Sequence, residues 1–519
     1  MNLDEKQSYF QRKGAAFLRN FLLIFIVLQP VFDCYYFYTD ELASMIGFTI
    51  PPLLAVFCVA LMLLLYLVMD LHHFTQRETL LLFAYFALCI VYFVIHHITN
   101  ATFNSVVPGD FGYSMINEAY YVVRLILPFI ILFLTYQLSI SRESFYRVLE
   151  ILCLLISGTI VLSNLFKISL SSYTNEVIKD NIFAWFTNNT YRPVELTSKG
   201  FFSYANQISA LMMFLFPVML YRMTDKFCWW RVCIVIAQAL AMIMIGTKTA
   251  AYGVLLELGT FALVMLFSAL VQKKLNRATL RRYRGAILTI CVALILSGVI
   301  LQKSPVLQKQ VERQQSIAER VKKEGTMKIE EEDEYYQLSF EDRVQYIEDS
   351  YYAYSLQEDF VKKSYPYEYD PDFWYEILKE PLANRLDYRF LELAMINHVV
   401  EINHDPMDKW FGISATRETN IFKVERDYIA QYYSMGIVGV VIFMVPFVVL
   451  AIAYSLYSIW KKNWDHIFEN LSLSMALDVV LLIGLITGNC LDGLFMTVVL
   501  GFFSGRLLLN VAQAKRERS

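Results

Sequence analysis

The chain has 519 residues, of which 57% are hydrophobic and 15% aromatic, and its formal net charge is −3. This apolar content exceeds what a soluble domain can bury, so the composition excludes an ordinary soluble protein and predicts an integral membrane protein. The apolar runs are continuous rather than alternating, and a membrane span needs roughly 20 apolar residues, so the expected fold class is an all-α polytopic membrane protein.

The apolar runs predict about twelve membrane-spanning helices. They lie near residues 15–38, 49–69, 79–97, 119–139, 146–166, 203–222, 231–247, 249–271, 285–302, 431–458, 470–489 and 491–510. Lys and Arg gather in the short connections on one side, whereas the predicted turns at 39–48, 98–118 and 489–492 on the other side carry none. By the positive-inside rule, both termini are expected in the cytoplasm.

One long polar insertion separates the ninth and tenth spans. Residues 303–428 contain 27 acidic and 17 basic residues, so the rest of the chain is net basic. Within the insertion, residues 305–363 are charged and compatible with helix, Pro366 and Pro371 interrupt the middle, and residues 381–402 predict one amphipathic helix. The expected divisions are 1–302 with nine spans, 303–430 as an extracellular loop folded as a lid, and 431–519 with three spans and a cytoplasmic tail.

Several ionisable residues fall near the expected outer ends of the spans, where their desolvation is costly and a function is the default hypothesis. They are Asp33, His96, His97, Arg124, Lys199, Lys248 and Asp492. Arg192 lies in the outer segment 167–202. Cations that face one outer cavity suit an anionic group at the membrane surface, above all a pyrophosphate leaving group. Snorkelling to the interface is the alternative for each residue.

Lys248 lies between two threonines at a turn that joins two spans with almost no loop. Its side chain must therefore point to the outer aqueous face or into a cavity. Contact with phosphate is the favoured interpretation, and capping of a helix end is the alternative.

The second half of the insertion offers a phosphate clamp and a base. Arg385 and Arg389 are four residues apart, which places them on one face of the predicted helix. His398, three turns further on, and His404 just beyond it are candidate bases for a sugar hydroxyl. The alternative is a solvated helix face with two surface histidines.

Two acidic residues, Glu425 and Asp427, come directly before the tenth span. At this position the insertion re-enters the membrane, so either carboxylate could act as a base or orient one. A solvated turn is the alternative.

Three absences narrow the class of protein. No phosphate-binding glycine loop is present, which argues against ATP-driven transport. Neither a His-Glu-x-x-His motif nor a cysteine and histidine cluster is present, so no metal and no cofactor are expected. The Asp370-Pro371-Asp372 run has the form of an Asp-x-Asp metal motif, but it lies in an acidic run on the expected outer side, away from nucleotide sugars.

Five short motifs resemble the O-antigen ligase and Wzy-type polymerase family, especially members from Gram-positive bacteria. They are Lys199-Gly200-Phe201-Phe202 with Asn206 and Ser209, Gly246-Thr247-Lys248-Thr249, Trp410-Phe411-Gly412-Ile413, Glu425-Arg426-Asp427 and Gly436-Ile437-Val438-Gly439. The layout of twelve spans with one large outer loop extends the resemblance over nearly the whole chain.

The resemblance implies a metal-independent, inverting glycosyltransferase of the GT-C class that acts at the outer face of the bacterial plasma membrane. It implies that Lys199, Lys248 and either Arg385 or Arg389 hold the pyrophosphate of an undecaprenyl-linked glycan. Ligases of the family commonly carry a His-Asn pair near the end of the large loop, where this chain has Glu425-Arg426-Asp427. The base therefore remains open among Asp427, Glu425, His398 and His404.

The expected activity is that of a polysaccharide polymerase, which transfers an undecaprenyl-pyrophosphate-linked chain onto a lipid-linked repeat unit. One alternative is a ligase that moves a finished glycan to another surface molecule. A flippase or transporter is the alternative of another class, although the chain lacks the two similar halves common in transporters. The expected partners are the lipid-linked donor and acceptor, the bilayer, a chain-length regulator and a flippase, and no nucleic acid.

Overall fold

The structure, a computed structural model, describes residues 3–38, 49–69, 71–187, 191–273, 277–324, 332–488 and 490–516. Regular structure in these residues is helical, and their only β contacts are two isolated bridges, Cys34 with Phe202 and Leu170 with Val177. The predicted all-α class is confirmed. The predicted turn at 39–48 lies outside the described residues.

Ten helices in the described part of the chain are long and apolar enough to cross a membrane. Each of the twelve predicted spans coincides with helical structure, and the two outside this set of ten are α1 (Leu3–Val27) and the shorter α10 (Trp229–Met244). The chain is therefore a polytopic membrane protein.

The helices form two compact units. Unit 1 comprises Met1–Phe86, Val123–Lys309 and Pro446–Ser519, and unit 2 comprises Ala87–Val122 and Gln310–Val445. Two long helices, α5 (Arg77–Asn100) and α6 (Met115–Gln137), contribute to both units. Unit 2 thus combines most of the polar insertion with residues 87–122.

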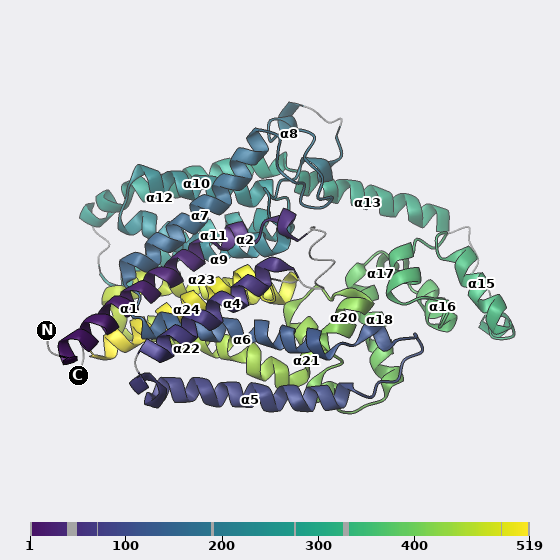
Figure 1. Ribbon diagram of the computed structural model, residues 1–519. Coiled ribbons are helices and arrows are strands. Elements are labelled where there is room, and N and C mark those ends of the chain that lie inside the picture. Colours follow the sequence, from purple (N-terminus) through teal and green to yellow (C-terminus); the bar gives the residue numbers. More distant parts are fainter. Residues whose placement is uncertain are drawn as a thin grey trace. The chain divides into compact units, whose positions relative to one another are not determined.

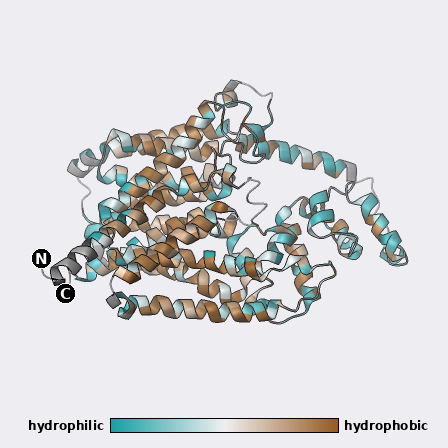
Figure 2. Cartoon of the chain, in the orientation of Figure 1, coloured by the Kyte–Doolittle hydropathy of each residue, from teal (hydrophilic) through white to brown (hydrophobic). Residues whose placement is uncertain are grey.

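Unit 1 contains most of the membrane-spanning helices, which are predominantly hydrophobic (Figure 2). Besides α1 and α10 they are α4 (Ile50–Met69), α7 (Arg142–Leu165), α9 (Ala205–Asp225), α11 (Lys248–Val271), α12 (Arg277–Gln302), α22 (Val445–Ile459), α23 (Ile467–Ile486) and α24 (Leu494–Arg516), with the short α2 (Gln29–Phe32) and α8 (Ala184–Thr187). Within unit 1 the start of α1 and the end of α24 lie at the same end of the bundle (Figure 1).

Helix α9 is the central helix of unit 1. It packs against α7, α10, α11 and α23, and every residue from Ile208 to Thr224 is buried. A helix that is apolar on all sides is stable only when neighbours surround it, and this sequence has that pattern.

Unit 2 contains the helices of the insertion and the first helix of the tenth predicted span, around a core rich in aromatic residues. The helices are α13 (Pro305–Glu324), α14 (Glu332–Tyr335), α15 (Phe340–Ser350), α16 (Pro371–Lys379), α17 (Leu382–Arg385), α18 (Tyr388–Asn403), α19 (Asp408–Phe411), α20 (Ala415–Phe422) and α21 (Asp427–Phe443). Trp374 is fully buried in this core, and its indole N–H donates to the carbonyl oxygen of Tyr365 at 2.7 Å.

Two predicted helices are wrong in detail. The predicted helix 381–402 is interrupted at residues 386–387, because the Asp387 side chain accepts the backbone N–H of Arg389 at 3.1 Å and starts α18 there. The tenth predicted span, 431–458, consists of α21 and α22, and Gly436 adopts a left-handed φ of 67° inside α21. Pro371, expected to interrupt helix, instead lies in the first turn of α16, where proline is favourable.

Candidate functional site

At one end of unit 1, polar segments that are distant in sequence are joined by main-chain hydrogen bonds. The N–H of Tyr35 donates to the carbonyl oxygen of Phe201 at 2.8 Å, and the N–H of Ser198 donates to that of Met244 at 2.9 Å. These bonds connect residues 33–38, the 167–204 connection and the start of the 245–249 turn. We call the described residues of these segments, together with residues 487–488 and 490–493, the loop end of unit 1.

Hydroxyl pairs connect the remaining segments of the loop end. Ser209 Oγ lies 2.7 Å from Thr247 Oγ1, which ties the first turn of α9 to the start of α11. Thr249 Oγ1 lies 2.6 Å from Thr487 Oγ1, just past the end of α23. The segments that carry Asp33, Lys199, Lys248 and Asp492 therefore meet at one end of unit 1, whereas His96 and His97 belong to unit 2.

Lys199 is buried within the loop end, with only 1% of its surface exposed. Its ammonium group donates to the carbonyl oxygen of Ser203 at 2.7 Å and to the Asn175 side chain, and it lies 5.3 Å from the centre of the Tyr35 ring. Burial lowers the pKa of Lys199 to about 8, against the opposing effect of the Asp33 carboxylate. Lys199 thus fixes the surrounding segments and can lose its charge in mildly alkaline solution.

Lys248 is the first residue of α11, and its side chain is exposed. The capping role belongs to Thr247, whose side chain accepts the N–H of Ala250 at 3.3 Å. Lys248 has no hydrogen bond or ion pair to another described residue. A cation at a helix N-terminus opposes the helix dipole, and together with the first-turn N–H groups it favours an anion.

Arg124 and Arg192 differ in how the protein holds them. Arg124 Nη2 donates to the carbonyl oxygen of Asp492 at 3.0 Å and lies 3.9 Å from its Oδ1 atom, so Arg124 is bound to the loop end. Arg192 is exposed and precedes the short 3-10 helix η4 (Pro193–Leu196).

The structure separates the two arginines that the sequence placed on one helix face. Arg385 ends α17 and is 5% exposed, and its guanidinium donates to the carbonyl oxygens of Glu380 (2.8 Å) and Tyr354 (2.5 Å). Arg389 lies in α18, and its Nε donates to Glu425 Oε2 at 2.9 Å. The predicted placement of both arginines on one helix face is therefore wrong: Arg385 binds backbone carbonyl oxygens, and Arg389 pairs with a carboxylate.

His398 forms a dyad with an aspartate from the preceding part of the insertion. Its Nε2 lies 2.7 Å from Asp370 Oδ2, and its ring stacks on Phe373 at 4.7 Å between centres. Burial would raise the pKa of Asp370, but hydrogen bonds from His398, Tyr365 and the N–H of Phe373 outweigh it and lower that pKa. An ionised carboxylate then orients the imidazole, whose side chain is 30% exposed.

The other three candidate bases have different surroundings. His404 is exposed and ends α18 with a left-handed φ of 57°. Glu425 is half-exposed and paired with Arg389. Asp427 is the first residue of α21 and is 2% exposed.

Two buried glutamates that the sequence analysis did not single out hold the segment containing Glu425. Glu392 Oε2 accepts the N–H of Glu425 at 3.1 Å, and Glu418 Oε1 accepts the N–H of Val424 at 2.5 Å. For Glu392, the only sign in the sequence is that it stands among the apolar residues of the predicted 381–402 helix. Periodicity alone does not distinguish such a residue from a surface charge.

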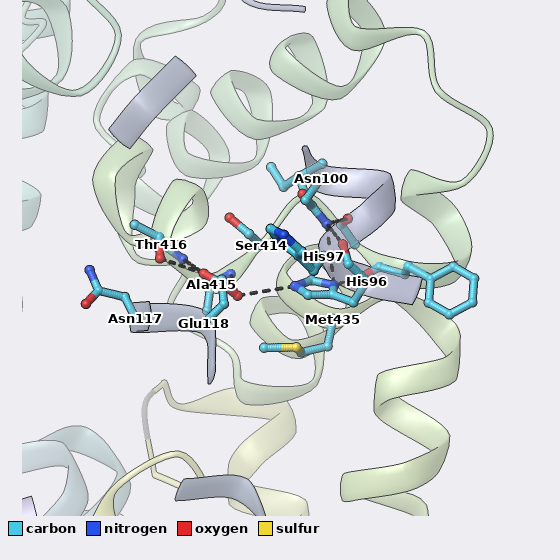
Figure 3. Close-up of polar contacts among 12 residues, drawn as sticks. His96, His97, Asn100, Asn117, Glu118, Ser414, Ala415, Thr416 and Met435 are labelled. Carbon is cyan, nitrogen blue, oxygen red and sulfur yellow. Dashed lines mark hydrogen bonds and ion pairs between the residues drawn. The ribbon is translucent and has the colours of Figure 1, made fainter. Parts of the chain in front are cut away.

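A buried polar network in unit 2 joins α5 and α6 to residues 412–416, at the start of α20 (Figure 3). His96 Nε2 lies 3.2 Å from Glu118 Oε2, and both side chains are fully buried. Glu118 also accepts the N–H of Ala415 (3.2 Å) and both the N–H (2.7 Å) and the hydroxyl (2.6 Å) of Thr416. His96 is among the candidate residues that the sequence indicates, whereas Glu118 is not. The only sign of Glu118 in the sequence is an acidic residue directly before a predicted span.

Arg417 completes this network as a structural cation. Its guanidinium donates to Asn100 Oδ1 at 2.8 Å and to the carbonyl oxygens of Asn100 (3.1 Å) and Asp110 (3.0 Å). It also lies 3.9 Å above the centre of the Phe103 ring. These contacts fix the start of α20 against the connection that follows α5.

The carboxylates of the Asp-Pro-Asp run serve different partners. Asp370 caps α16 and binds His398, whereas Asp372 accepts two hydrogen bonds from Arg343 Nη1 at 2.7 and 2.6 Å. Within the described residues no group of three or more His, Cys, Asp or Glu side chains could hold a metal ion.

The fold and these sites define a polytopic helical membrane protein with cations at one end of its transmembrane unit and a folded polar insertion. The family model of the O-antigen ligase like membrane proteins matches residues 15–514, and the chain belongs to this family. A comparison with curated proteins gives no significant match. Family membership suggests a membrane enzyme that handles glycans, with glycosyltransferase-type activity.

Proposed function

We propose that this protein is a polysaccharide polymerase that transfers an undecaprenyl-pyrophosphate-linked glycan onto the sugar of a lipid-linked repeat unit at the outer face of the bacterial plasma membrane. The observation that carries the proposal is the loop end of unit 1, where Lys199, Lys248 and Arg124 lie on segments joined by hydrogen bonds in a chain of the O-antigen ligase like family. Cationic side chains at a membrane surface suit a diphosphate.

In the proposed reaction, a hydroxyl oxygen of the acceptor sugar bonds to the anomeric carbon of the donor. The bond from that carbon to the diphosphate oxygen breaks, and the diphosphate leaves with both electrons. Lys248 and the first-turn N–H groups of α11 stabilise its charge. The hydroxyl proton passes to a general base.

Two arrangements among the residues that the structure describes have the chemistry of such a base. His398 has an ionised Asp370 on Nε2, which leaves Nδ1 to accept a proton. Glu425 lies in the segment that takes the place of the family's His-Asn pair, and its Oε2 accepts a hydrogen bond from Arg389 Nε at 2.9 Å. The variants His398→Asn and Glu425→Gln separate the two, because only loss of the base lowers kcat by about 100-fold or more at unchanged KM.

The cation proposal is tested by Lys248→Ala, with Lys273→Ala as the matched control at the other end of α11, where Lys273 is also exposed. With purified protein and a lipid-diphosphate glycan, Lys248→Ala should slow transfer about 10- to 100-fold, and the control should leave it unchanged. Transfer at the wild-type rate by Lys248→Ala would refute the proposal. Product length distinguishes the alternative activity, because a ligase leaves the glycan length unchanged.

A further inference from the structure

Glu392, on α18, combines deep burial with an ionisable group. Its surface is 1% exposed, Oε2 accepts the N–H of Glu425 at 3.1 Å, and Oε1 has no hydrogen-bond partner among the described residues. A buried N–H needs an acceptor, but an amide or hydroxyl oxygen would serve without the desolvation cost of a carboxyl group. The use of a carboxyl group here calls for a role beyond satisfying one N–H.

We propose that Glu392 is a positioning residue for the segment 424–427, and that its protonation state sets how firmly this segment and the Arg389–Glu425 pair are held. The inference rests on the proposed function, because it gives the segment that replaces the family's His-Asn pair its anchor. It does not depend on which of the two candidate bases takes the proton.

The first support is that the segment has two independent anchors from different helices. Glu392 on α18 holds the N–H of Glu425, and Glu418 on α20 holds the N–H of Val424 at 2.5 Å. Both glutamates are buried, whereas the Glu425 side chain they position is 39% exposed and reaches Arg389 at 2.9 Å. Buried supports that fix an exposed charged pair are the arrangement expected of a preorganised site.

The second support is the charge that surrounds Glu392. The charged groups that influence it are Glu425, Arg389 and Arg426, and burial raises the pKa of Glu392 to about 7. Of the charged groups on the helices packed against α18, Arg385 on α17 and Arg417 and Glu418 on α20 are bound to backbone atoms. Glu392 is therefore the carboxyl group here whose charge changes near neutral pH.

The ionised and neutral forms of Glu392 hold the segment differently. A carboxylate accepts a backbone N–H more strongly than a neutral carboxyl group does, because charge-assisted hydrogen bonds are roughly twice as strong. The anchor on Glu425 should tighten as pH rises through the pKa of Glu392. Activity should rise over the same interval.

The test compares Glu392→Gln, Glu392→Ala and the exposed control Glu401→Ala, which lies on the same helix. Gln keeps an acceptor for the N–H of Glu425 but cannot ionise, and Ala removes the acceptor. We expect Glu392→Ala to lower kcat for glycan transfer about tenfold or more, Glu392→Gln to remain within about threefold but to lose the rise near pH 7, and the control to match wild type. Wild-type kcat in Glu392→Ala, or an unchanged pH profile in Glu392→Gln, would overturn the inference.

Hydrogen exchange of the peptide 423–428 provides a readout that does not require activity. After correction for the intrinsic pH effect, exchange should be faster in Glu392→Ala than in wild type and should slow in wild type as pH rises through 7. Equal exchange in wild type and Glu392→Ala would refute the positioning role even in an active enzyme. If the wild-type chain transfers no glycan while the exchange differences appear, the proposed function fails and the anchoring role stands.

Discussion

The Nε2 atom of His96 lies 3.2 Å from Oε2 of Glu118, and neither side chain has exposed surface. The other ring nitrogen of His96, Nδ1, lies 2.6 Å from the carbonyl oxygen of Phe411. Both nitrogens therefore face oxygen acceptors, while Glu118 accepts hydrogen bonds from Ala415 and Thr416 as well. The Glu118 carboxylate and the carbonyl oxygen of Phe411 together hold the imidazole ring of His96 in one orientation.

Removal of Glu118 should destabilise unit 2 strongly. Glu118→Ala leaves a buried histidine and the N–H groups of Ala415 and Thr416 without their acceptor, so we expect a loss of about 3–5 kcal/mol in the free energy of unfolding. Asn117→Ala is the control, because Asn117 is the exposed neighbour of Glu118. Thermal unfolding in detergent measures both variants, and equal midpoints would contradict a structural role for the pair.

Gly436 should not tolerate a side chain. Its φ is 67°, and a Cβ atom would lie 2.3 Å from the carbonyl carbon and oxygen of Trp410. Gly436→Ala should therefore cost about 2 kcal/mol or more, because backbone strain and a clash with rigid main chain add together.

Gly298→Ala is the matched test for Gly436, since nothing lies within 4 Å of the new Cβ in α12. It should change stability by no more than about 1 kcal/mol, in the stabilising direction. A Gly436→Ala protein with the melting temperature of Gly298→Ala would show that the segments at 410 and 436 can separate freely.

Lys199 should make substrate binding sensitive to alkaline pH. Burial lowers the pKa of Lys199 to about 8, so the ammonium group loses its charge as pH rises through that value. Diphosphate affinity should then fall between about pH 7.5 and 9 in wild type but not in Lys199→Arg, whose guanidinium stays charged. Binding of a lipid-diphosphate glycan measured across this range tests the effect, and a parallel decline in both proteins would exclude Lys199 as its source.

Glu392 should also make stability depend on pH. Burial raises its pKa from 4.5 to about 7, because the desolvation cost of the ionised carboxylate exceeds the gain from its stronger hydrogen bond to the N–H of Glu425. The stability that Glu392 contributes to the whole fold is therefore fully present below about pH 4.5 and is lost as pH rises through 7, even though the local hydrogen bond tightens. The full difference corresponds to at most about 3 kcal/mol. Glu392→Gln should remove this loss, as judged by unfolding midpoints at pH 5 and pH 8.

Asp408→Asn is the comparison for Glu392→Gln. Burial raises the pKa of Asp408 to about 6, so its contribution to stability is lost at lower pH than that of Glu392. If wild type and Glu392→Gln lose the same stability between pH 6.5 and 8, the carboxyl group of Glu392 does not titrate in that interval.

The sequence by itself determined the membrane class, the helical structure at all twelve predicted spans and the position of the polar insertion. A run of apolar residues must form a helix in the bilayer, because no water is present to satisfy its peptide groups. The cations of the loop end could also be predicted, because a charge at the end of a span is visible without any knowledge of packing.

Only the tertiary structure decided the partners of those charges. It separated Arg385 from Arg389 because Asp387 starts a new helix between them, and it paired His398 with Asp370 across 28 residues of sequence. It also showed that Glu392 and Glu418 face inward, where they hold the segment before α21. Hydrogen bonds between distant segments depend on how helices pack, and residue spacing along one helix does not specify that packing.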